Sequence, residues 1–354
     1  MKATRNLRRP RVLIVGCGDV GMRCVPLLRT RAHVFALTSH AGRGAELRAA
    51  GVTPLVGDLD ARRSLKRLAG LAPTVLHLAP PQKTGDDDRR TRALLATLSA
   101  RGDRALRAAR GAVAPIGRLR RIRASWAESE TANIVPDRVR WTAAPRGPVR
   151  LVYASTTGVY GDCGGAWIDE TRVTQPANPR AKRRVSAEQQ LRRATARGVV
   201  AASIARIPGI YAGNRLPLAR LEKRTPALID ADDVYTNHIH ADDLAAILVR
   251  LVTHGRPARV IHASDDTSLK MGEYFDVVAD AFGHEHAPRI TRADAEQQME
   301  PTLLSFMRES RRLVNRRLKE ELRVRLQYPS VADFLREVRG RRDTAKLGEA
   351  QTDG

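Results

Sequence analysis

Residues 12–21 read Val-Leu-Ile-Val-Gly-Cys-Gly-Asp-Val-Gly, and this stretch is the strongest indicator of the fold. Its first four residues are apolar and mostly branched, which is typical of a strand buried on both faces of a parallel sheet. Gly16, Gly18 and Gly21 follow in the spacing Gly-x-Gly-x-x-Gly, and residues 22–30 have the apolar spacing of a helix. The order of strand, glycine turn and helix predicts a dinucleotide-binding unit.

Each glycine of the turn has a physical role toward a bound dinucleotide. The first permits a tight turn, the second lets backbone N–H groups approach a pyrophosphate, and the third lets helix and strand touch. The helix N-terminus adds partial positive charge. The alternative is a plain glycine turn without a ligand. The backbone predicted to hold the diphosphate belongs to Gly16, Gly18, Asp19, Val20 and Gly21.

The end of the second predicted strand, residues 33–37, bears on the choice of cofactor. A carboxylate there would accept the ribose 2′-OH of NAD, whereas basic or hydroxyl residues suit the 2′-phosphate of NADP. Residues 38–43 read Thr-Ser-His-Ala-Gly-Arg, without an acid. We therefore predict NADP, with Arg43 as the phosphate partner and Thr38 and Ser39 as hydroxyl donors. NAD stays an alternative, as does a solvated surface role for Arg43.

Two more predicted strands, residues 53–56 and 74–78, are separated by a helical stretch at 61–70. Repeated βαβ units of this kind predict an α/β fold, a Rossmann-type doubly wound parallel sheet with ligand at the carboxyl ends of its strands. The residues after these strands then line the cofactor. We expect Asp58 and Leu59 near the adenine, and Ala79 and Pro80 near the middle of the dinucleotide.

The chain is strongly basic, with 62 Lys and Arg against 38 Asp and Glu in 354 residues. Residues 101–150 hold 12 arginines and four acids, and no helical or strand period persists there. We interpret residues 101–148 as a poorly ordered insertion. A nucleic-acid patch is the sharper alternative, but its stacking aromatics are limited to Trp126 and Trp141, so we expect no nucleic-acid partner.

A buried-strand composition returns at residues 151–155, and Ser155 to Asp162 read Ser-Thr-Thr-Gly-Val-Tyr-Gly-Asp. This resembles the Ser-Ser-x-x-Val-Tyr-Gly segment of extended short-chain dehydrogenases/reductases, the superfamily of nucleotide-sugar epimerases and dehydratases. Residues 205–211 and 238–245 resemble later segments of that family, in the same order. The resemblance implies an NAD(P)-binding oxidoreductase or epimerase that acts on a carbonyl or hydroxyl group of a small, sugar-nucleotide-like substrate.

The resemblance places Thr156 as the residue that holds the substrate oxygen, but the family's Tyr-x-x-x-Lys pair is replaced. Aligning residues 186–188 on the family's helix puts Arg180 at the Tyr position and Arg184 at the Lys position. A guanidinium stays protonated, so Arg180 cannot relay a proton. Arg184 remains a fixed cation for ribose or phosphate. Tyr160 is the nearest phenol and is our candidate proton carrier, with pocket lining as its alternative.

Two hypotheses follow for the whole protein. The first is an atypical member that catalyses hydride transfer with the residues just named. The second is a catalytically impaired dinucleotide sensor or scaffold that lacks the Tyr-x-x-x-Lys pair. We leave open which of the two applies.

The resemblance also implies a division into two parts. Residues 11–100 and 149–212 form the dinucleotide-binding domain, to which 232–263 return, and 213–231 with 264–335 form a smaller C-terminal substrate lobe. Residues 340–354 are expected to be a disordered tail. Residues 305–318 are helix-like and rich in arginine, so Arg311 or Arg312 are candidates for a diphosphate clamp or for a solvated helix face. Asp242 or Asp243 is expected to cap the helix that follows.

Several classes of protein and of site are not supported by the sequence. No apolar run approaches the roughly 20 residues that cross a bilayer, so we expect no membrane partner. Three cysteines make neither a disulfide framework nor a metal site, and His238 with His240 lacks a third zinc ligand. We expect no metal, no secretory signal and a cytoplasmic protein. Extended members are often homodimers, so a homodimer stays open.

Overall fold

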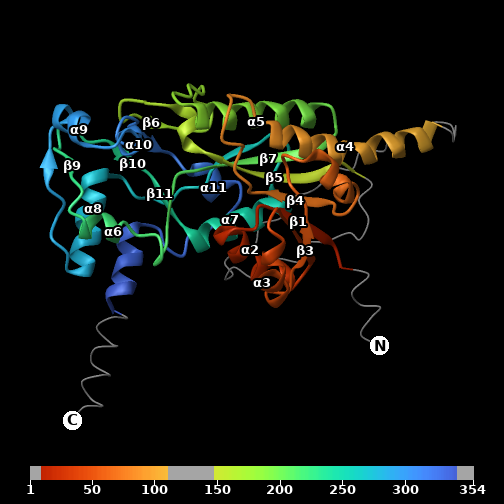
Figure 1. Cartoon of the computed structure of the whole chain (residues 1–354), viewed down its shortest axis with the longest axis horizontal. Coiled ribbons are helices and arrows are strands. Elements are labelled where there is room, and N and C mark those ends of the chain that lie inside the picture. Colours follow the sequence, from red (N-terminus) through yellow and green to blue (C-terminus); the bar gives the residue numbers. More distant parts are fainter. Residues whose placement is uncertain (1–8, 111–146, 341–354) are drawn as a thin grey trace, which may run out of the picture.

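The computed structural model describes residues 9–110 and 147–340, and it is built around one parallel sheet of seven strands (Figure 1). The strand order is β12-β7-β5-β4-β1-β2-β3. This confirms the predicted doubly wound fold, because the order reverses between β1 and β4, where such sheets bind their ligands. The strands are β1 (Arg11–Val15), β2 (His33–Thr38), β3 (Thr53–Val56), β4 (Thr74–His77), β5 (Val149–Thr156), β7 (Val200–Ile207) and β12 (Val260–His262).

Helices cover both faces of the sheet (Figure 1). Alternate residues of β1 point to opposite faces, as strand geometry requires. Val12 and Ile14 therefore belong to one apolar cluster, and Leu13 and Val15 to the other. The first cluster packs against α2 (Asp19–Arg29), α3 (Gly44–Ala49), α7 (Ala241–His254) and α11 (Arg316–Glu320); the second packs against η2 (Arg62–Leu68), α4 (Arg89–Arg110) and α5 (Pro179–Ala196).

A third apolar cluster lies beside the sheet and includes Tyr211, Phe275, Val278, Met307 and Phe334. Its helices and strands are α6 (Leu218–Glu222), β9 (Ala227–Leu228), α8 (Met271–Phe282), β14 (Arg289–Ile290), α9 (Arg292–Gln298) and α10 (Pro301–Phe306), and residues 331–340 are also helical. The division into a dinucleotide-binding domain and a substrate lobe stays a prediction.

Short strand pairs connect the sheet to this third cluster. β8 (Gly209–Tyr211) pairs with β11 (His238–His240), β10 (Tyr235–Thr236) with β13 (Leu269–Lys270), and β6 (Trp167–Ile168) with β15 (Arg312–Leu313). His238 and His240 are buried here and pack against the ring of Tyr211. Within the described residues, no helix is both long enough and apolar enough to cross a membrane.

Several boundaries differ from the sequence-based expectations. α4 continues from Arg89 to Arg110 without a break at residue 101, because its helical spacing carries on; the rest of the expected insertion, 111–146, lies outside the described residues. Residues 305–318 are not one helix, since β15 interrupts them by pairing with β6. The expected tail includes Gly340, which is helical, while 341–354 lie outside the described residues.

The expected cap of α7 was also wrong. His240 is the N-cap residue, and its ring nitrogen accepts a hydrogen bond from the Asp242 backbone N–H. Asp243 instead accepts the backbone N–H groups of Gln327 and Tyr328, at 2.7 and 2.9 Å. A distant loop therefore uses this carboxylate, which leaves the helix end to the histidine.

The backbone at Gly16 gives a first prediction. Gly16 has φ +88°, and a Cβ added there would lie 2.5 Å from the backbone nitrogen of Ala79. We expect Gly16→Ala to lower the free energy of unfolding by at least about 1–3 kcal/mol, the cost of a non-glycine residue in that backbone region. Urea denaturation measures it. Gly147→Ala is the control, because its Cβ meets nothing within 4 Å; similar losses in both variants would contradict the argument.

Candidate cofactor and substrate site

The glycine turn after β1 forms a cradle that side chains would fill. The Gly16 carbonyl accepts the Gly18 N–H at 3.0 Å, which closes the turn. A Cβ added to Gly18 would meet nothing within 4 Å, whereas one added to Gly21 would lie 3.3 Å from Cys17 Sγ. Gly18 is thus open toward a ligand, and Gly21 allows α2 to pack closely on the turn. This geometry fits the diphosphate of a dinucleotide.

Asp19 and Val20 occupy the first turn of α2, directly after Gly18. The N-cap residue Gly18 brings no side chain, so the first amides of the helix are not capped by it. The Asp19 carboxylate lies 3.2 Å from Arg23 Nε and 3.1 Å from Arg215 Nε. Two guanidinium groups therefore offset the one negative charge that lies next to the expected diphosphate.

Arg43 reaches from η1 (Ala41–Arg43) to the glycine turn. Its Nη1 donates to the Cys17 carbonyl at 2.6 Å, while Nε and Nη2 donate to the Glu46 carboxylate at 3.0 and 2.7 Å. The same hydrogen bonds lower the pKa of Glu46. A basic residue thus lies at the expected ribose end, but an acidic residue that sequence reasoning missed is bound to it.

The two hydroxyl residues before Arg43 differ in accessibility. Thr38 is buried, and its hydroxyl bonds within its own turn to the backbone of His40. Ser39 is exposed, with its Oγ 3.1 Å from the ring Nδ1 of His40. Of the two, Ser39 is the better placed to contact a phosphate.

The residues predicted near adenine and the middle of the cofactor follow β3 and β4. Asp58 Oδ1 accepts the Asp60 N–H at 2.9 Å, and Leu59 is buried. Ala79 donates its N–H to the Val15 carbonyl at 2.9 Å, which places it against the end of β1. Pro80 is exposed, and its carbonyl accepts from Arg90 Nη1 at 3.1 Å. Ala79 and Pro80 thus continue from β4 along the glycine turn.

Thr156 is the last residue of β5 and caps the short helix η3 (Thr157–Tyr160), where its Oγ1 accepts the Gly158 N–H at 3.4 Å. A buried polar group fixes this strand end. Ser155 Oγ donates to Glu188 at 2.6 Å, and Glu188 forms an ion pair with Arg206 at 2.7 Å. Because both charged side chains are 3% exposed, water contributes little to their solvation.

Tyr160 is held by His262. Its hydroxyl lies 2.5 Å from His262 Nε2, while His262 Nδ1 lies 2.9 Å from the Val314 carbonyl. A carbonyl only accepts, so Nδ1 carries the proton and Tyr160 donates to Nε2. Burial raises the pKa of Tyr160 to about 12 and lowers that of His262 to about 4. At neutral pH this geometry supports a structural role for Tyr160 better than proton transfer.

Arg180 and Arg184 lie one turn apart on α5. Arg184 Nη1 donates to the Ala154 carbonyl at 2.6 Å and to the Tyr153 hydroxyl at 3.1 Å. The guanidinium is therefore attached to β5 two residues before Thr156. Desolvation, followed by the charge of Arg184, lowers the pKa of Arg180.

Glu309 is a neighbour of Thr156 that sequence reasoning missed. A Cβ added to Gly158 would lie 3.8 Å from Glu309 Oε2 and 3.8 Å from Thr156 Oγ1, so these two oxygens are no farther apart than twice that distance. Glu309 Oε1 accepts from Asn178 at 3.4 Å, and Oε2 from Arg311 at 2.8 Å. No sequence motif joins residues so far apart in the chain.

The two arginines considered for a diphosphate clamp have other partners. Arg311 donates to the Gly161 carbonyl at 2.9 Å as well as to Glu309. The Arg312 guanidinium lies over two rings, 5.1 Å from the centre of Trp167 and 4.4 Å from that of Tyr235. Both side chains therefore join the loop before β15 to the segment after β5.

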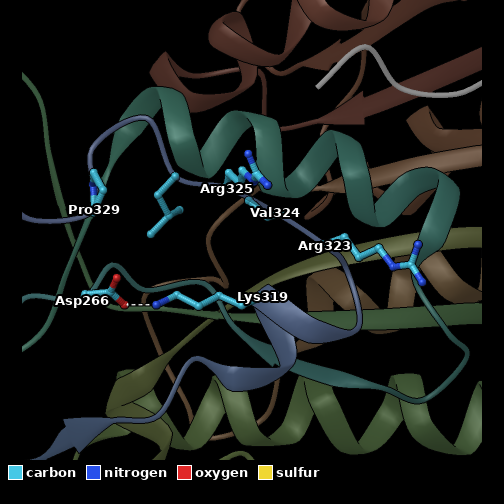
Figure 2. A pocket seen from close by; sticks show the side chains of 7 residues that line it. Asp266, Lys319, Arg323, Val324, Arg325 and Pro329 are labelled. Carbon is cyan, nitrogen blue, oxygen red and sulfur yellow. Dashed lines mark hydrogen bonds and ion pairs between the residues drawn. The ribbon is translucent and has the colours of Figure 1, made fainter. Parts of the chain in front are cut away.

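A separate hollow of about 430 Å³ lies beside α7 and α11 (Figure 2). Lys319 pairs there with Asp266 at 2.6 Å, and Arg323 and Arg325 lie on the same wall. None of the residues predicted for cofactor or substrate lines this hollow. It is thus not part of the site at the strand ends.

Comparison with known families agrees with this arrangement. A model of the NAD-dependent epimerase/dehydratase family matches residues 12–263, a span that runs from β1 to the end of β12. The chain belongs to the NAD-dependent epimerase/dehydratase family. This confirms the resemblance seen in the sequence and supports a nicotinamide dinucleotide as the cofactor of this epimerase/dehydratase-family protein. No curated protein matches the sequence.

Solved structures share the fold at low sequence identity. A conserved protein of unknown function from Silicibacter pomeroyi is 23% identical with a TM-score of 0.68, over 94% of this chain and 98% of its own. UDP-glucose 4-epimerase from Thermotoga maritima, solved with UDP-glucose, is 15% identical with a TM-score of 0.64, over 92% and 96%. dTDP-glucose 4,6-dehydratase from Bacillus anthracis, solved with NAD, is 12% identical with a TM-score of 0.65, over 95% and 97%.

The buried pair beneath Thr156 gives a second prediction. Arg206→Met leaves the Glu188 carboxylate buried without its cation, so we expect a loss of about 3–5 kcal/mol in the free energy of unfolding. The exposed pair Arg336–Asp333 is the control, and Arg336→Met should cost less than about 1 kcal/mol. The double variant Arg206→Met, Glu188→Leu should recover part of the loss. Equal effects of the two single changes in urea denaturation would contradict this.

Proposed function

We propose that this family member binds a nicotinamide dinucleotide, NADP(H) in preference to NAD(H), at the carboxyl ends of β1, β2, β4 and β5. The bound cofactor would supply hydride transfer to or from a carbonyl or hydroxyl carbon of a small substrate. A sugar-nucleotide-like substrate is the class that we propose, because the structurally similar epimerase of T. maritima was solved with UDP-glucose.

The observation that carries this proposal is the glycine turn at the reversal of strand order. Gly16 presses on Ala79 while Gly18 faces open space, so the turn keeps room for a ligand that no side chain of its own takes up. The N-terminus of α2, an 11-residue helix, begins directly behind it. Backbone amides and partial positive charge together suit a diphosphate.

The preference for NADP(H) rests on Arg43 and Ser39. Arg43 already contacts the carbonyl of Cys17 in the glycine turn, so its guanidinium lies near the expected ribose. Its pairing with Glu46 is exposed to solvent and is therefore weak enough to be exchanged for a phosphate. NAD(H) is the second candidate, because Glu46 offers a carboxylate at the same end.

In the catalysed reaction, Thr156 would hold the substrate oxygen, and Arg184 would fix the cofactor ribose or a phosphate. We propose that Tyr160 supports the end of β5 and leaves proton transfer to another group, since its hydroxyl already donates to His262. The same observation favours the second candidate function, a dinucleotide sensor or scaffold that binds the cofactor without turnover.

Cofactor binding is the decisive measurement. We expect fluorescence titration to show binding of NADPH and weaker binding of NADH. Gly18→Asp should abolish both, because it adds a negative charge beside the diphosphate at a position where the fold has room. Gly147→Asp is the matched control: it makes the same chemical change at an open position before β5 and should bind normally. Failure of the wild-type protein to bind either nucleotide would overturn the proposal.

Tyr160→Phe separates the two roles of the phenol. The change removes one buried hydrogen bond, so we expect the free energy of unfolding to fall by about 1–3 kcal/mol, the cost of leaving His262 without its partner. Any oxidation of NADPH in a panel of carbonyl compounds should be unchanged. A variant that stays folded, binds NADPH and loses turnover would instead make Tyr160 the proton carrier.

A further inference from the structure

We infer that the substrate of this site carries a negatively charged group, a carboxylate or a phosphate, and that Arg180 and Arg184 bind this group at the end of β5. The inference rests on the proposed function, because it concerns the ligand of the same crevice. It adds the charge of that ligand and the residues that recognise it.

Arg184 offers a cation whose charge is not met by the groups it touches. Its two contacts, the Ala154 carbonyl and the Tyr153 hydroxyl, are neutral and use Nη1 alone. Over residues 9–110 and 147–340, no carboxylate forms a salt bridge with Arg184. A guanidinium carries five N–H donors in a fork, so Nε and Nη2 stay available for an anion.

Two more arginines stand beside it on the first turns of α5. Arg180 precedes Arg184 by four residues and therefore shares its helix face, an arrangement in which like charges repel. Arg183 is 7% exposed, donates to the Gly85 carbonyl at 2.6 Å, and has no partner for Nε among the described residues. Positive charge is thus concentrated at a helix end that already has positive character.

The carboxylates around α5 do not balance this charge, because most of them are bound to other groups. Glu309 attracts Arg180, but it also forms an ion pair with Arg311 at 2.8 Å. One carboxylate is therefore shared among several arginines. The others and their partners are Asp86 with Lys182, Asp87 with Arg92 and Ser186, Asp88 with Thr91, and Glu188 with Arg206.

The location of this charge points to the substrate. Arg184 is attached to β5 two residues before Thr156, the residue proposed to hold the substrate oxygen. Between Thr156 and Glu309, a Cβ added to Gly158 would make only ordinary contacts at 3.8 Å, so this position has room for a small group. An arginine fork recognises carboxylate and phosphate oxygens in two parallel hydrogen bonds. The anion would therefore sit beside the reacting oxygen.

The test compares two probes that differ by one carboxylate. UDP-glucuronate and UDP-glucose are titrated calorimetrically into the full-length protein saturated with NADPH. We expect UDP-glucuronate to bind about tenfold tighter or more, the ratio that a charge-assisted hydrogen bond supports. Arg180→Gln and Arg184→Gln should each reduce this ratio to near one. Arg192→Gln, on the exposed side of the same helix, removes the same charge and should keep the ratio.

Each other outcome overturns the inference. Equal affinities in the wild-type protein, a preference that survives both substitutions, or no binding of either probe to protein that binds NADPH would do so. Loss of NADPH binding in Arg180→Gln would assign this arginine to the cofactor and also count against it. Failure of the wild-type protein to bind NADPH would count against the proposed function instead. Arg184→Lys keeps the charge and should retain part of the preference if Arg184→Gln fails to fold.

Discussion

The close approach of the backbone at Gly16 to that at Ala79 is the constraint on which the site depends. β1 and β4 are neighbours in the sheet, and both chains turn away from its edge at this point. The Val15 carbonyl accepts the Ala79 N–H, and Gly16 turns with a positive φ that lets the two segments separate in opposite directions. A side chain at residue 16 would push them apart. The crevice for a dinucleotide is the direct result of this contact.

A second set of buried contacts fixes the end of β5. Ser155, Glu188 and Arg206 join β5, α5 and β7, and the Arg206 guanidinium lies 4.6 Å from the centre of the Tyr160 ring. Tyr160 in turn donates to His262 at the end of β12. This network does not include residues 180 and 184. Arginines can therefore occupy the positions of the family's Tyr and Lys without disturbing the strand end that presents Thr156.

The sequence was sufficient for the sheet but not for the contacts between distant segments. The branched run at residues 12–15 and the glycine spacing after it predict β1 and its turn, because both patterns are local. Glu309 carries no local signal: it reaches Gly158 only because β15 pairs with β6, and that pairing also replaced the helix expected there. Likewise, Asp243 looked like a helix cap until residues 327 and 328 brought two N–H groups to it. Pairing between remote segments, rather than propensity, decided each of these cases.

The replacement of a phenol and an amine by two guanidinium groups changes what the crevice can do. A tyrosine beside a lysine both binds an oxygen and exchanges its proton, whereas an arginine near neutral pH only donates hydrogen bonds and charge. Arg180 and Arg184 therefore separate recognition from proton transfer. Recognition of an anion becomes stronger, because two forks replace one hydroxyl and one point charge. Proton transfer then requires a group on the substrate, water or Glu309, the carboxylate whose oxygen faces Gly158 next to Thr156. A reaction that needs no proton at the substrate oxygen would be free of this requirement, and so would a sensor.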